Sequence, residues 1–262
     1  MTFRVALALS YQGSSFEGWQ TQPHGNTVQD RLQEAVASIA GHPVQVFCAG
    51  RTDTGVHARQ QVVHFDTPSQ RPESAWIKGV NAWLPPSVSV QGACRVPETF
   101  HARFGALSRA YRYFFYTATS PCPLKPGMVW LHYPVNLEHM RQAALCLLGT
   151  HDFSAFRSSQ CQANSPVRTL YALNIVQKGD WAYAHIQGNA FLHHMVRNIM
   201  GCLLEVGLGN RPVDWVCEVL KSESREQAAR TYPAHGLTLW EVEYPQEFGI
   251  AALFSRAKLD FL

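Results

Sequence analysis

One short run of the sequence gathers residue types that can act together in catalysis. The run from Ala49 to Ala58 reads AGRTDTGVHA, and its single carboxylate, Asp53, follows Arg51 by two residues and lies between Gly50 and Gly55. Glycine permits tight backbone turns, and loops on a rigid scaffold commonly carry catalytic groups. An aspartate in a glycine-containing loop is also common as an ordinary turn residue, and on physical grounds alone that interpretation is the stronger one.

Two other segments could contribute side chains to such a site. Tyr111 lies on an expected strand, where its ring could stack on a nucleobase and its hydroxyl could exchange a proton, whereas Tyr113 is expected to pack in the core. Arg197 lies on an expected helix one turn before Gly201, and the small residue leaves room for a long side chain. Taken alone, Arg197 is more simply interpreted as a surface residue of an amphipathic helix.

The elements that must position these residues follow the same order in both halves of the chain, roughly β-α-β-β-α-β, with an extra helix in the second half. In the first half the patterns predict strands at 3–9, 44–49, 61–65 and 88–95, and helices at 27–41 and 73–84. In the second half they predict strands at 109–117, 168–177, 181–187 and 237–244, and helices at 136–149, 193–206 and 213–221.

This order predicts an α+β fold. Each half is expected to form an antiparallel sheet with its helices packed on one face, and the two sheets are expected to join side by side with the active-site cleft between the halves. The predicted halves are 1–104, which carries the loop of Asp53, and 105–262, which carries the strand of Tyr111 and the helix of Arg197.

The composition excludes some classes of protein. The 262 residues include 17 arginines and five lysines for a net charge of +3, and arginine suits phosphate oxygens and bases, although a GC-rich genome would equally account for it. The seven cysteines form no CxxC pair, which argues against a disulfide framework. With neither a signal peptide nor a membrane-spanning stretch expected, the sequence predicts a soluble, cytoplasmic protein.

Histidines are the main argument for a metal enzyme. Zinc hydrolases show HExxH or paired cysteines, and neither pattern occurs in the sequence. No metal is therefore expected, and the histidines are interpreted as structural or RNA-contacting residues. The histidines considered are His57, His64, His101, His193 and His194.

The run from Gly50 to Ala58 resembles the GRTDxGVHA loop of the tRNA pseudouridine synthase A family, with Thr54 where alanine is usual. The likeness continues, in family order, over nearly the whole chain, which makes it highly specific. The other matching segments are Tyr11–Gly13, Phe16–Gln20, Thr27–Gln29, Gln61–Phe65, Phe100–Arg103, Ser108–Tyr113, His151–Phe156 and Gly188–Asn198.

The resemblance implies an isomerase that converts uridine to pseudouridine at positions 38, 39 and 40 of the tRNA anticodon stem-loop, without a metal or other cofactor. It implies that Asp53 acts as nucleophile or base, that Arg197 pairs with it, and that Tyr111 stacks on the flipped uracil. Arg51 is expected to enter the gap left by the base or to clamp its phosphate.

The resemblance also implies partners. These are the tRNA itself, gripped mainly through shape and phosphates, and a second copy of the chain, with each tRNA spanning both subunits of a homodimer. Further substrate-binding candidates on the basic surface are Arg59, Arg103, Arg109, Arg157 and Arg168.

Two other functions remain open from the residues. One is a noncatalytic RNA-binding protein that keeps the fold, which the joint presence of Asp53, Tyr111 and Arg197 argues against. The other is a glycoside or nucleoside hydrolase that uses Asp53 with a second carboxylate such as Asp66, because glycoside hydrolysis requires two acids facing one sugar. No comparable motif surrounds Asp66.

Overall fold

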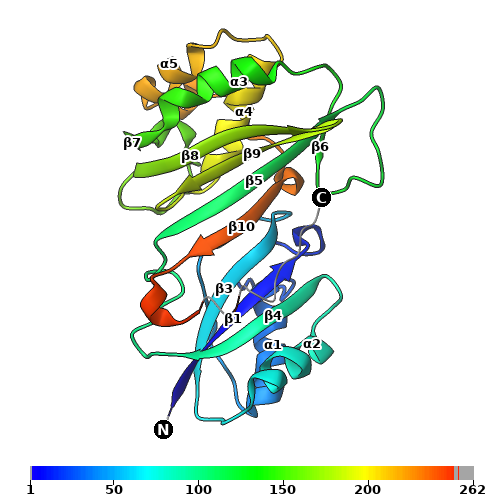
Figure 1. Ribbon diagram of the computed structural model, residues 1–262, viewed down its shortest axis with the longest axis vertical. Coiled ribbons are helices and arrows are strands. Elements are labelled where there is room, and N and C mark those ends of the chain that lie inside the picture. The colour runs from blue at the N-terminus through cyan, green and yellow to red at the C-terminus, as the bar shows by residue number, and fades with distance from the viewer. Residues whose placement is uncertain (1, 251–252, 254–262) are drawn as a thin grey trace. The chain divides into compact units, whose positions relative to one another are not determined.

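The computed structural model describes residues 2–250 and 253, drawn as a ribbon in Figure 1. The chain forms two compact units, each described by itself below. Unit 1 comprises the residues up to Leu107 and those from Leu239 onward, and unit 2 comprises Ser108–Thr238. The predicted halves assigned everything after residue 104 to the second half. The observed division differs because the last strand, β10 (Leu237–Glu243), lies beside β3 (His57–Thr67).

The sheet of unit 1 is built around β1 (Phe3–Tyr11). This strand pairs antiparallel with β3 on one side, where Leu7 faces Val63, and with β4 (Val88–Val96) on the other, giving the order β4-β1-β3-β10. The alternation of apolar residues predicted this strand. In the structure Ala6 and Ala8 are buried as well, so both faces of the strand centre are covered.

The helices of unit 1 form where the predicted end signals lie. Helix α1 (Val28–Ala40) begins after Thr27, whose side-chain oxygen accepts a hydrogen bond from the Asp30 N–H at 3.2 Å. It ends at Gly41, whose φ of 79° only glycine adopts readily. The predicted helix at 73–84 forms as a π-helical turn, Ala75–Gly79, followed by α2 (Val80–Trp83).

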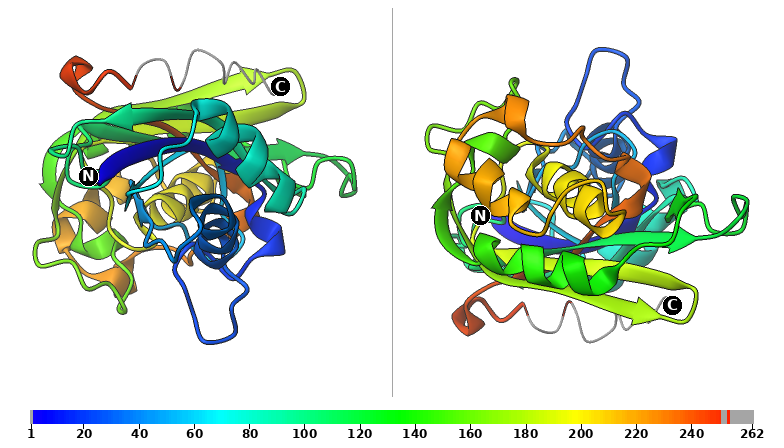
Figure 2. Two further views of the ribbon diagram at one scale, coloured as in Figure 1. Left: turned by 90° about the horizontal axis from the view of Figure 1, so that it is seen from below. Right: turned by 90° about the horizontal axis from the view of Figure 1, so that it is seen from above.

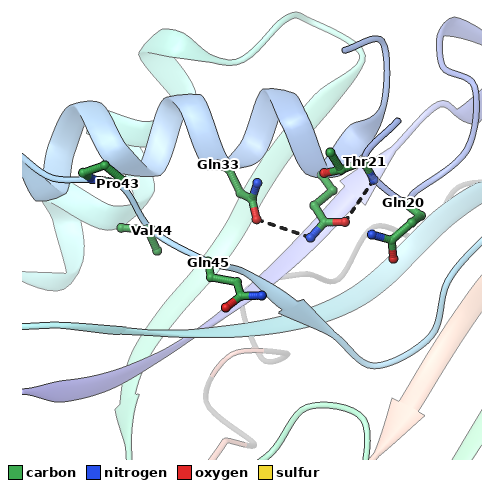
Figure 3. Close-up of a pocket in the computed structure, with 7 residues that line it drawn as sticks. Gln20, Thr21, Gln33, Pro43, Val44 and Gln45 are labelled. Atoms are coloured by element: carbon green, nitrogen blue, oxygen red, sulfur yellow. Dashed lines mark hydrogen bonds between the residues drawn. The ribbon is translucent and has the colours of Figure 1, made fainter. Parts of the chain in front are cut away.

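The expected strand at 44–49 is much shorter than predicted. Only β2 (Phe47–Cys48) pairs, with β3. The reason is that Val46 bonds to side chains of α1: its N–H donates to Gln33 Oε1 at 3.1 Å, and its carbonyl accepts from Gln29 Nε2 at 3.2 Å. A shallow cavity of about 500 Å³ opens beside this segment (Figure 3). It is lined by Gln20, Thr21, Gln29, Gln33, Pro43, Val44 and Gln45.

The sheet of unit 2 has the order β5-β9-β8-β7 and is antiparallel throughout this path. Three of these strands were predicted, and they are β5 (Ser108–Thr117), β8 (Val167–Lys178) and β9 (Trp181–Gly188). The sequence did not predict β7 (Gly149–Asp152) or β6 (Val129–Leu131), which pairs parallel with β5. Strands of three or four residues are too short to show a period of two.

The three helices of unit 2 lie together on one face of its sheet (Figure 2). They are α3 (Leu137–Ala144), α4 (Met195–Gly207) and α5 (Trp215–Ser222), and α4 contacts the other two. Nearly every residue of α4 is buried, so this helix forms the core of the unit.

The predicted α+β class is confirmed, since each unit combines a largely antiparallel sheet with helices, and the pairing of β6 with β5 in unit 2 is parallel. Among the described residues, no helix combines the length and the apolar character needed to cross a membrane. The sequence from Pro245 onward is also expected to form a tail packed on the surface, and this segment falls largely outside the described residues.

Candidate active site

Asp53 lies in the loop that joins β2 to β3 in unit 1, as the first residue of the turn that leads into β3. The loop closes as a tight turn, because the Val56 N–H donates to the Asp53 carbonyl at 3.1 Å and Gly55 adopts a φ of 82°. The glycine in the motif is therefore required by the backbone. Asp53 is half-buried.

Buried polar contacts fix the residues just before Asp53. The backbone carbonyl of Thr52 accepts a hydrogen bond from the Trp19 N–H at 3.0 Å, and its hydroxyl lies 2.8 Å from the Tyr11 hydroxyl. The amide nitrogen of Gln61, which is fully buried, donates to the Gly50 carbonyl at 2.7 Å. Such contacts hold a loop in one conformation before any substrate arrives.

Two glycines let the opening segment of the chain lie directly against this loop. A Cβ on Gly13 would come within 1.9 Å of the Val56 carbonyl oxygen, which no side chain can do. A Cβ on Gly18 would lie 3.0 Å from the Thr52 carbonyl oxygen, and Gly18 has a φ of 89°. The sequence pattern included both glycines without revealing their role as the support of the Asp53 loop.

Three of the histidines in unit 1 have structural roles, one of the two interpretations that the sequence left open. Nδ1 of His57 accepts a hydrogen bond from the Gly13 N–H at 3.1 Å. Nδ1 of His64 accepts from the Ala102 N–H at 3.2 Å, and Nδ1 of His101 accepts from the Arg103 N–H at 3.1 Å. Each of these rings therefore fixes a segment of backbone.

In unit 2 the tyrosines of β5 occupy different surroundings. Tyr111 is 7% exposed and packs edge-on against the ring of Phe191, with 5.1 Å between the ring centroids. Tyr113 is fully buried and its hydroxyl donates to the Pro233 carbonyl at 2.8 Å, and burial raises the pKa of this hydroxyl well above its usual range. Tyr113 is thus a core residue, as expected.

Arg197 lies on the first turn of α4 and donates from Nε to the Tyr232 carbonyl at 2.9 Å. The role expected of Gly201 is corrected by the structure. A Cβ there would lie 2.4 Å from the Arg230 carbonyl oxygen. The missing side chain of Gly201 therefore leaves room for the backbone near Arg230, and not for the side chain of Arg197. That backbone in turn places the carbonyl to which Arg197 bonds.

Asn198 is a buried polar residue whose importance the sequence did not reveal. Its amide nitrogen donates to the Phe156 carbonyl at 2.8 Å, and its amide oxygen accepts from the Thr231 hydroxyl at 2.7 Å and from Arg225 at 3.2 Å. The start of α4 is also held in a strained conformation, because His194 has a φ of 64°. These features fix the turn of α4 that carries Arg197.

The arginines predicted to bind RNA have different exposures. Arg51 and Arg103 are exposed, and Arg59 is half-buried over the ring of Trp240 at 4.8 Å. The other three donate to backbone carbonyls of their own unit. These are Arg109 to Asn189 at 3.0 Å, Arg157 to Cys161 at 2.6 Å and Ala163 at 3.0 Å, and Arg168 to Ser165 at 2.9 Å and Val167 at 2.6 Å.

The predicted site residues therefore fall into two groups. Asp53, with Arg51 beside it, belongs to unit 1, whereas Tyr111 and Arg197 belong to unit 2. The pairing of Asp53 with Arg197 stays a prediction. Within each unit, the residues carrying the proposed chemistry lie on backbone that is fixed by buried hydrogen bonds.

Comparison with known proteins gives consistent matches over most of the chain. A family model described as tRNA pseudouridine synthase matches residues 7–105 and 143–245. The chain is 50% identical over 250 residues to tRNA pseudouridine synthase A of Paraburkholderia xenovorans, covering 95% of this chain and 93% of that protein. It is 53% identical over 248 residues to tRNA pseudouridine synthase A of Bordetella petrii, covering 94% and 92%.

The chain is also similar to a solved structure described as an archaeal box H/ACA sRNP Nop10–Cbf5 complex, with 10% sequence identity and a TM-score of 0.36. The match covers 88% of this chain and 59% of that chain. The family model and the close relatives cover both the loop of Asp53 and the helix of Arg197. By these matches the chain belongs to the tRNA pseudouridine synthase family.

Proposed function

We propose that the protein isomerises uridine to pseudouridine at positions 38, 39 and 40 in the anticodon stem-loop of tRNA, with Asp53 as the catalytic residue. Identity of about half over 95% of the chain with tRNA pseudouridine synthase A supports the reaction. The observation that carries the assignment of Asp53 is its place at the start of a turn, directly after residues that the buried contacts of Thr52 and Gly50 hold in one conformation.

The reaction breaks the bond from the ribose to N1 of uracil and forms a bond from the ribose to C5. N1 gains a proton and C5 loses one, so no hydrolysis or oxidation occurs and the uracil must stay bound throughout. A fixed carboxylate suits this chemistry either as a nucleophile or as a base. In this proposal Asp53 has that role, Tyr111 stacks on the flipped uracil and Arg197 pairs with the carboxylate.

The substrate proposed is a folded RNA, and its target uridine must leave the stack before a carboxylate can reach its ribose. Arg51 is exposed and lies two residues before Asp53, so it can occupy the gap or hold the neighbouring phosphate. We further propose a homodimer in which each tRNA spans both subunits, with Arg59 and Arg103 among the phosphate contacts, together with Arg109, Arg157 and Arg168.

The experiment that tests this proposal compares two isosteric changes. Asp53→Asn should abolish pseudouridine formation in an unmodified tRNA with uridines at 38–40 and leave the tRNA dissociation constant within about threefold, because the shape is kept. Asp66→Asn is the control, since Asp66 forms a surface ion pair with Arg4 at 2.8 Å. It should retain nearly full activity with a small loss of stability.

Other outcomes would favour the alternatives. Release of free uracil by the wild-type protein, lost in both variants, would indicate a hydrolase that uses two carboxylates. A folded wild-type protein that binds tRNA without forming product would indicate a noncatalytic RNA-binding protein.

A further inference from the structure

Unit 1 exposes two large aromatic rings on and beside β2, the strand that leads into the loop of Asp53. Phe47, on β2, is 40% exposed and Phe104 is 76% exposed. The ring of His101 links them, with centroid distances of 5.8 Å to Phe47 and 4.5 Å to Phe104. Three rings in contact therefore form one surface, and β2 is separated from Asp53 by only four residues of sequence.

These rings rest on a fixed base. Phe47 stacks on the buried ring of His64 at 5.1 Å with 21° between the planes, and His101 packs edge-on to the same ring at 4.6 Å. The backbone that carries Phe104 is fixed as well, because Nδ1 of His101 accepts hydrogen bonds from the N–H groups of Arg103 and Phe104. The surface is thus formed before any ligand binds, which lowers the entropic cost of binding.

The surroundings of the rings are positively charged. The guanidinium of Arg103 lies over the ring of Phe104 at 5.4 Å, and Arg51 is exposed on the loop that follows β2. Burial raises the pKa of the Cys48 thiol to about 12, and the positive charges of Arg51 and Arg103 both oppose this shift. The two guanidinium groups therefore both lie near Cys48 on β2. Asp66 lies near His64, but it forms an ion pair with Arg4.

Exposed aromatic rings flanked by arginines are how proteins hold unpaired nucleotides, because each base offers a π-face to a ring and each phosphate pairs with a guanidinium. We propose that Phe47, His101 and Phe104, with Arg51 and Arg103, form a stacking platform for an unpaired base of the RNA substrate other than the base that reacts at Asp53. This inference rests on the proposed function. A stem closed into continuous duplex offers no such base, so the platform selects RNA with an open loop.

The test measures dissociation constants at fixed salt for two RNAs, an anticodon stem-loop and the same stem extended as duplex in place of the loop. Phe104→Ala should weaken binding of the stem-loop about fivefold or more, as loss of one stacked base predicts, and leave duplex binding unchanged. Phe104→Leu should behave like Phe104→Ala, because it keeps apolar area without a π-face, and Phe104→Trp should restore binding. Trp83→Ala is the control, since Trp83 is 66% exposed elsewhere in unit 1.

Phe47→Ala should likewise weaken binding of the stem-loop and leave duplex binding unchanged. Its urea unfolding curve shows whether removal of the ring from His64 also lowers the stability of the protein. Equal losses on both RNAs, or wild-type binding by Phe104→Ala, would overturn the platform and leave the proposed reaction standing if the wild-type protein still forms pseudouridine. Wild-type protein that neither binds the stem-loop nor forms pseudouridine would overturn the proposed function as well.

Discussion

At the scale of single residues, many of the polar side chains that match the family fix backbone in place. Gln61 and Asn198 are buried and bond to carbonyls of Gly50 and Phe156, and the rings of His57 and His64 accept hydrogen bonds from backbone N–H groups. An uncharged imidazole is needed for this acceptor role, because the protonated ring has only donors. The protonation state of a buried histidine therefore affects the stability of the fold.

His64 gives the clearest case. Its burial, with smaller contributions from His101 and Arg4, lowers its pKa from 6.5 to about 4. Between these values the unfolded chain takes up a proton at His64 and the folded protein does not, so acid favours unfolding. We expect the free energy of unfolding to fall as pH drops from about 6.5 to 4, with a contribution from this residue of about 3 kcal/mol at most, and none above that range.

Urea unfolding at pH 7.5, 5.5 and 4.5 would measure this dependence. His64→Gln keeps an acceptor for the Ala102 N–H but cannot titrate, so its unfolding free energy should depend less on pH than that of the wild type. His139→Gln is the control, because His139 is an exposed residue of α3. Identical pH dependence for wild type and His64→Gln would show that His64 does not titrate as described.

At the scale of elements, the opening segment of the chain supports the Asp53 loop through close backbone contacts. Gly18 has a φ of 89° and lies against the Thr52 carbonyl. Gly25 has a φ of 69°, but a Cβ added to it would have no other atom within 4 Å. Alanine at either position brings a backbone cost of about 1 kcal/mol, because both need the left-handed region. Only the change at Gly18 also pushes on the loop that carries Asp53.

Gly18→Ala should therefore lower the turnover of tRNA about 10- to 100-fold, as expected when a catalytic group moves by around an ångström, whereas Gly25→Ala should keep turnover near the wild-type value. Rates at saturating tRNA and urea unfolding of both variants would test this. Equal turnover in the two variants would mean that the contact between Gly18 and Thr52 does not position Asp53.

The same scale shows what the sequence could predict. Helix α1 was located closely because its signals are local, with a cap at Thr27 and a left-handed glycine at Gly41. The strand expected at 44–49 was largely replaced, because Val46 bonds to side chains of α1 that lie more than ten residues away. Likewise the Asp53 loop was evident as a motif, whereas its support by Gly13 depends on a contact between distant segments, which no local pattern encodes.

At the scale of the whole molecule, a net charge of +3 is too small to account for RNA binding through bulk attraction. Binding must instead depend on where the arginines are placed. Arg109, Arg157 and Arg168 donate to backbone carbonyls, so part of their hydrogen-bonding capacity is used within unit 2. Arg51 and Arg103 are exposed, and they are the arginines best placed for phosphate contacts beside the Asp53 loop.

The dependence of RNA affinity on salt distinguishes these groups. Removing one arginine that pairs with a phosphate should reduce the slope of log K against log salt by about 0.7 to 0.9. Arg103→Ala should therefore flatten the slope by that amount with little change in stability. Arg157→Ala should flatten the slope and also lower stability, since its guanidinium holds two carbonyls of its own loop. Arg211→Ala is a matched control, because Arg211 also lies over an aromatic ring, that of Trp215 at 5.0 Å, on unit 2. A slope unchanged by Arg103→Ala would mean that this arginine supports the ring of Phe104 without touching a phosphate. A slope flattened equally by Arg211→Ala would mean that the phosphate-binding surface extends well beyond the Asp53 loop.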